Sequence, residues 1–118
     1  MQTPMHIAEL TASTLTRLRG EMAGRQVAAS AQAEAVELDF GQTSVSLSFL
    51  DGLVLTLQGE HLLHRVTFVT ANPVVYSRLA RIAGERSVTI GVSLRPGEAH
   101  TSAASAPVRH FELDEHLE

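Results

Sequence analysis

The chain has 118 residues, of which 44% are hydrophobic and 19% charged, a composition that fits one soluble domain with a single core. It contains no cysteine, which excludes disulfides and thiolate metal sites. The formal charge of −4 argues against a protein that binds nucleic acid by neutralising phosphates. All basic residues are arginine, so lysine Schiff-base chemistry and a Walker-type phosphate loop are excluded.

The sequence also bears on location. No apolar run approaches the roughly 20 residues needed to span a bilayer, so we expect no membrane partner. The N-terminus has no basic region followed by an apolar core, so we do not expect a secretory signal. The expected location is the cytoplasm.

The first half of the chain predicts a strand, a helix and a second strand. Residues 5–10 could form a short first strand, and residues 14–33 are rich in Ala, Arg, Gln and Glu, which favour helix. Residues 35–40 alternate between apolar and acidic side chains, which is typical of a strand with one buried face. A turn over residues 41–47 follows.

The predicted helix over residues 14–33 has one apolar face, made by Leu15, Leu18 and Met22. Gly20 and Gly24 weaken its early turns, because glycine lowers helix stability. A helix that becomes regular only after Gly20 is therefore an alternative.

The second half predicts two more helices and two more strands. We expect a helix over 48–63, a strand over 65–70, a helix from Pro73 to a stop at Gly84, and a strand over 88–94. Asn72 is expected to cap the second of these helices, with Pro73 at its first position.

The element order β-α-β-α-β-α-β predicts an α/β fold, a small sheet of about four strands with about three covering helices. Helical crossovers favour parallel neighbours, although residues 88–94 alternate enough for a half-exposed edge strand. We expect residues 1–97 to form the α/β domain. Residues 98–118 would be a flexible extension, or one with a short strand through Val108 to Leu113.

Two short motifs carry a resemblance to a known family. Leu38-Asp39-Phe40, followed by Ser48-Phe49-Leu50-Asp51, resembles the central motif of STAS domains, which occur in anti-sigma factor antagonists and sulfate transporters. The match is closer to the shorter STAS-like bacterial domains, and Arg17-x-x-Gly20 with Gly24-Arg25 is similar to the helix entry of that group. The likeness covers roughly residues 5–94.

The resemblance implies a non-enzymatic regulatory domain that acts by protein-protein contact and could serve as a partner-switching element. Its protein partners would be a histidine-kinase-like ATPase or an anti-sigma-type regulator. Ser48 falls at the phosphoacceptor serine of the antagonists, whereas Leu47 stands where they carry Asp. The contact surface would be the turn Gly41 to Ser48 and the exposed side of the helix that begins there.

The candidate site residues are Ser48, Ser46, Ser44 and Asp51. Ser48 could cap the helix, with Asp51 completing a capping box. It could instead accept a phosphate, which the helix N-terminus would stabilise, or simply contact a partner. Ser44 and Ser46 are weaker candidates, because turns are commonly rich in serine.

Two other pairs of titratable side chains have structural as well as functional interpretations. His61 and His64 could share a helix face, but catalytic zinc needs three protein ligands, so we expect surface histidines and no metal or cofactor. Asp39 and Asp51 could meet as an acid/base pair, although both also suit structural positions.

Three arginines, Arg78, Arg81 and Arg86, could form a solvated face of the last predicted helix or a basic patch for an acidic partner. Two alternatives to a regulatory domain remain. One is a small-ligand or nucleotide-binding module with a pocket over the strand ends. The other is a self-associating domain, a possible homodimer, that pairs through the half-exposed strand over residues 88–94.

Overall fold

The computed structural model describes residues 3–31, 35–96 and 108–111. In chain order the elements are β1 (Thr3–His6), α1 (Ile7–Leu10), α2 (Arg17–Ala31), β2 (Val36–Gly41), α3 (Leu47–Gly59), the 3-10 helix η1 (Leu63–Arg65), β3 (Val66–Thr70), α4 (Pro73–Arg86), β4 (Ile90–Leu94) and β5 (Val108–Phe111). No helix within these residues has both the length and the apolar character needed to cross a bilayer.

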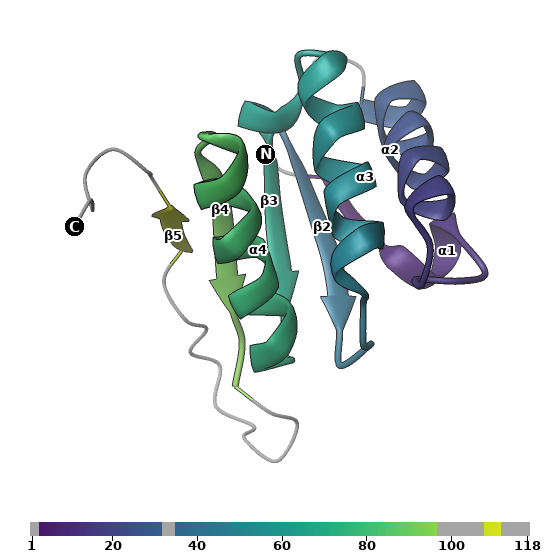
Figure 1. Cartoon of the computed structure of the whole chain (residues 1–118). Helices are drawn as coiled ribbons and strands as arrows, with labels where there is room; N and C mark the ends of the chain where they lie inside the picture. The colour runs from purple at the N-terminus through teal and green to yellow at the C-terminus, as the bar shows by residue number, and fades with distance from the viewer. Residues whose placement is uncertain (1–2, 32–34, 97–107, 112–118) are drawn as a thin grey trace.

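The strands form one sheet in the order β1-β2-β3-β4-β5. The first four are mutually parallel, and β5 pairs with β4 in the antiparallel sense. When parallel strands follow one another in order, crossovers of one hand place every connecting helix on the same face of the sheet. Figure 1 shows this arrangement, with α2, α3 and α4 side by side on one face. The predicted α/β fold is confirmed.

The ends of the sheet differ from the prediction. Residues 88–94 are not an edge strand, because β4 lies between β3 and β5 and four of its five residues are buried. The short strand expected through Val108 to Leu113 is observed as Val108–Phe111, while residues 98–107 and 112–118 lie outside the described residues. At the other edge, the expected strand over 5–10 is β1 (Thr3–His6), and the chain then turns into α1.

The core lies between the sheet and the three long helices. Strands β2 and β3 place Phe40 and Phe68 next to each other on the covered face, with their rings stacked at a centroid distance of 6.1 Å. The apolar stripe of α3 packs on the same face and is fully buried at Phe49, Leu50, Leu53, Val54 and Leu57. The central strands and α3 are therefore positioned by ordinary burial of an alternating and a helical apolar pattern.

Helix α2 packs on α3 through glycines, so the face that α2 buries is not the apolar face that was predicted. A Cβ added to Gly20 would fall well inside contact distance of the Phe49 carbonyl oxygen and 3.1 Å from the Leu53 amide nitrogen. One added to Gly52 of α3 would lie 2.5 Å from the Arg17 carbonyl oxygen. The two backbones therefore approach closely. The glycines, which were predicted to weaken the helix, form the face through which it packs. The expected apolar face, Leu15, Leu18 and Met22, is exposed.

Two helix ends were predicted at the wrong residue. Helix α3 stops at Gly59 rather than near Leu63, because His61 adopts a left-handed conformation and the Leu62 amide donates to the Leu57 carbonyl. Helix α4 continues through Gly84 to Arg86, and Ser87 takes the left-handed position. The start of α4 is as predicted, since the Asn72 side chain accepts from the Val74 amide.

Candidate functional site

The serine-rich turn between β2 and α3 is the centre of the predicted site. Its cap is Ser46, whose hydroxyl accepts from the Phe49 amide at 3.0 Å. The prediction that Ser48 caps this helix is therefore wrong by two residues. Ser48 is the second residue of α3 and is exposed, so its hydroxyl lies beyond the cap position.

The turn is bound to the segment that leads into α2. The Ser46 hydroxyl donates to the Leu15 carbonyl at 2.8 Å, and the Ser46 amide donates to the Thr14 carbonyl at 3.0 Å. In return, the Thr14 hydroxyl donates to the Ser44 carbonyl at 2.8 Å. Ser44 contributes its backbone and Ser46 its hydroxyl, so both act structurally in this turn.

Asp51 does not complete a capping box. Its carboxylate instead receives Arg17 Nη1 at 2.6 Å, Arg86 Nη2 at 2.6 Å and Arg86 Nε at 2.9 Å. The hydrogen bonds from Arg86 lower the pKa of the Asp51 carboxyl from 3.8; partial burial opposes this and the Arg17 bond adds to it. Asp51 therefore joins α2, α3 and α4 as an ionised carboxylate.

Ser48 is the predicted helix hydroxyl that remains available, and the exposed Ser44 hydroxyl in the turn is likewise available. No polar partner for either hydroxyl is found within the described ranges 3–31, 35–96 and 108–111. Ser48 lies three residues before Asp51, so the two side chains are neighbours on the surface of α3. A charge placed on Ser48 would consequently meet the group of Arg17, Asp51 and Arg86.

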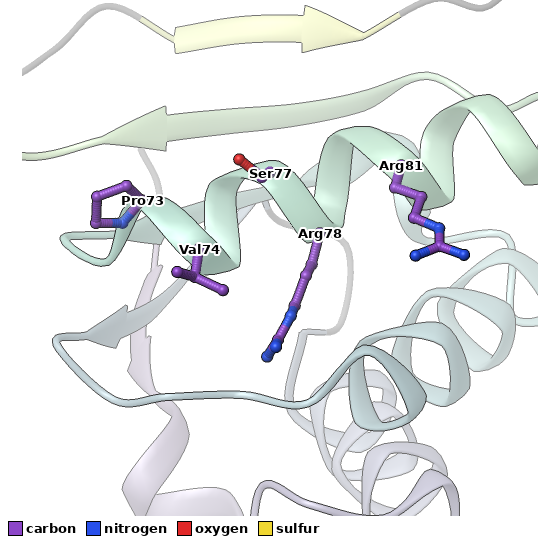
Figure 2. Close-up of a pocket in the computed structure, with 5 residues that line it drawn as sticks. All are labelled: Pro73, Val74, Ser77, Arg78 and Arg81. Carbon is purple, nitrogen blue, oxygen red and sulfur yellow. The ribbon is translucent and has the colours of Figure 1, made fainter.

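A surface hollow of about 370 Å³ lies on α4, next to the serine-rich turn that precedes α3. Pro73, Val74, Ser77, Arg78 and Arg81 line it. Figure 2 shows Val74 and Arg78 on the side of α4 that faces the loop leading into α3, and Arg81 further along the same helix. Arg78 Nη1 donates to the Val45 carbonyl at 2.7 Å and so ties α4 to the turn. Val74 is 51% exposed, which leaves an apolar side chain at this surface.

The three arginines considered as a basic patch all have partners. Arg78 is bound to the turn, Arg81 Nε pairs with Glu85 at 2.9 Å, and Arg86 pairs with Asp51. Their charges are therefore partly neutralised or directed inward, and they do not form a single basic surface.

Asp39 and Asp51 are not brought together as an acid/base pair. Asp39 accepts from the Gly41 amide and from Arg95 Nη1, at 2.8 Å and 2.9 Å. Arg95 follows β4 and also pairs with Glu37, so its side chain reaches β2 past the intervening strand β3. Sequence reasoning missed Arg95 altogether and missed the pairing of Arg86 with Asp51, because no local pattern connects an arginine with a carboxylate 35 or more residues away.

His61 and His64 line a separate hollow of about 400 Å³. His61 lies in the turn after α3 and His64 in η1, rather than both on a helix as expected. Within the part of the chain that the structure describes, no group of three or more His, Cys, Asp or Glu is placed to hold a metal ion.

The fold and this site define a small α/β domain whose serine-rich turn joins three helices. No protein-family model matches the chain, and neither the curated proteins nor the solved structures contain a significant match.

Proposed function

We propose that the chain is a STAS-like regulatory domain of the cytoplasm that binds a protein partner and catalyses no reaction. The partner class is a histidine-kinase-like ATPase or an anti-sigma-type regulator, as the resemblance implies. The proposed contact surface is the turn before α3, the first turn of α3 and the adjoining start of α4.

One observation carries this proposal: the two segments that resemble STAS-like domains pack on each other. Arg17 of the first segment binds Asp51 of the second at 2.6 Å. Gly20 of the first lies directly against the backbone of Phe49 in the second. Residues that are far apart in the sequence thus act as one structural unit, which supports reading them as a single motif.

The surface beside this unit has the properties of a recognition site. Ser48 and Val74 are both exposed, and Arg78 holds the turn against α4 so that the two form one surface. An apolar side chain among polar ones suits protein contact. Because Arg78 and Arg81 already have partners, the hollow offers less to a nucleotide phosphate than its two arginines suggest.

Ser48 is the residue at which a partner switch would act. Phosphorylation would add nearly two negative charges on the first turn of α3, where free amides favour them. The same charge would compete with Asp51 for Arg17 and Arg86. It would therefore change both the charge of the surface and the tie between the helices.

The test is a quantitative capture of partners from the native host with four variants. We expect Ser48→Ala to retain the wild-type partner, and Ser48→Asp and Val74→Glu to lose it. Gln58→Glu, which adds one charge at an exposed position near the far end of α3, is the matched control and should retain it. Retention by both Ser48→Asp and Val74→Glu would contradict the proposed surface.

A thermal-shift measurement separates this proposal from the small-ligand alternative. We expect no stabilisation by nucleotides or phosphate at millimolar concentration, since binding to the folded state alone would raise the melting temperature. A rise that Val74→Glu abolishes would favour the ligand-binding module instead.

A further inference from the structure

Helix α2 presents its large apolar side chains to solvent and its small residues to the core. Its buried face consists of Gly20, Ala23, Gly24 and Val27. On the outer side Leu18 is 62% exposed and Met22 is 43% exposed. A surface helix normally has the opposite arrangement, with large apolar residues facing the core.

The exposed apolar residues lie on α2 and just before it. Leu18 and Met22 are four residues apart, so their side chains are neighbours, and Leu15, 66% exposed, lies just before the helix. We call Leu15, Leu18 and Met22 the α2 stripe. A hollow of about 320 Å³, lined by Leu10, Met22, Arg25 and Gln26, continues it toward α1. From Leu15 to Gln26 this surface is about as long as three turns of a helix.

The charges around the α2 stripe are mainly positive. Arg25 lies in the hollow at one end, and Arg19 lies on one flank; both are exposed. Neither has an ion pair within residues 3–31, 35–96 and 108–111, whereas Arg17 is paired with Asp51. Glu21, on the other flank, is half-buried. The chain as a whole has a net charge of −4, so two unpaired guanidinium groups beside the stripe make this part of the surface locally basic.

From this geometry we propose that the α2 stripe binds an amphipathic helix of a partner protein with acidic residues beside its apolar face. The partner's apolar residues would cover Leu15, Leu18 and Met22, and one of them would enter the hollow beside Leu10. Its carboxylates would pair with Arg19 and Arg25. This is the helix-in-groove mode, in which apolar anchors supply affinity and flanking charges supply orientation.

Charge distinguishes this occupant from two others. In a symmetric dimer through α2, the arginines of both copies would be brought together, and like charges across an interface are unfavourable. An anionic membrane would meet the acidic charge of the whole chain, and the stripe contains no Trp, Tyr or Phe of the kind that anchors interfacial helices. An acidic helix, in contrast, contacts only the local basic surface.

The test uses a displayed library of 16-residue helical peptides with random residues on two faces. We expect selected peptides to have an apolar stripe flanked by Asp or Glu. By fluorescence anisotropy, their affinity for Leu18→Ser/Met22→Ser should fall at least about tenfold, and for Arg19→Glu/Arg25→Glu by a similar factor. Both pairs change exposed side chains, and an unchanged melting temperature checks that the fold is retained. Val74→Glu, at the other proposed surface, is the control and should bind like the wild type.

Several results would overturn the proposal. The proposal fails if no peptide is enriched or if the enriched peptides have basic flanks. It also fails if their affinity for Leu18→Ser/Met22→Ser is unchanged. Self-association of the free protein that this double variant abolishes would assign the stripe to a second copy. Sedimentation of the wild type, but not of the variant, with vesicles of anionic lipid would assign it to a membrane.

Discussion

Replacing Gly20 by alanine tests whether the close contact of α2 and α3 supports the fold. In an ordinary helix this change stabilises by about 1 kcal/mol, because alanine has the higher helix propensity. Here the added Cβ would lie 2.9 Å from the Phe49 carbonyl carbon and 3.1 Å from the Leu53 amide nitrogen, and closer still to the Phe49 oxygen. These atoms belong to the backbone and cannot move aside as a side chain can.

The helices would therefore have to separate, and overpacking of this kind costs about 1–3 kcal/mol. We expect a net loss in the free energy of unfolding of about 2 kcal/mol, taking the upper part of that range less part of the propensity gain. The measurement is urea denaturation followed by circular dichroism, with the midpoints compared at equal slope.

Gly59→Ala is the matched control. Gly59 is also helical, as the last residue of α3, but a Cβ there would meet nothing within 4 Å. We expect this variant to be as stable as the wild type or up to about 1 kcal/mol more stable. If Gly20→Ala were also neutral or stabilising, the close approach of the two helices would be refuted.

Three further predictions concern stability. Ser46→Ala should lower the free energy of unfolding by about 1–2 kcal/mol by removing the cap, whereas Ser48→Ala should change it by less than about 0.5 kcal/mol; equal effects would contradict the cap assignment. Because the pKa of Asp51 is lower in the folded state than its ordinary 3.8, its stabilisation is complete well above that pH and is lost as the pH falls through the folded value. The stability difference between wild type and Asp51→Asn in urea should therefore shrink toward acid pH, and one that grows would oppose this account. Phe68→Ala should cost about 3–5 kcal/mol in the same assay, since its ring is fully buried, and a loss below about 1 kcal/mol would contradict the described core.

The sequence predicted well those elements whose signals are local. Alternation in residues 35–40 identified β2, and Asn72-Pro73 identified the start of α4, because a strand face and a helix cap each depend on a few adjacent residues. The parallel sheet followed from the element order. These features needed no knowledge of distant contacts.

The candidate site was harder to predict, because its residues are selected by contacts across the chain. Both Ser46 and Ser48 suit a helix cap by composition. The structure uses Ser46, whose hydroxyl also donates to Leu15, 31 residues earlier. No window around the turn contains that information. The turn and the start of α3 are thus predicted in position, but the serine that caps the helix is not.

The orientation of α2 shows why apolar periodicity alone misled. Burying Leu18 and Met22 would gain about 1.5–3 kcal/mol for each side chain, so the pattern suggested that they face the core. With these residues inward, however, the helices could not approach as closely as they do at Gly20. The observed orientation keeps the backbones in contact and lets Arg17 reach Asp51. The exposed stripe therefore forgoes the free energy of burying Leu18 and Met22. A partner that covers the stripe would gain this free energy on binding, and the peptide selection tests for that gain.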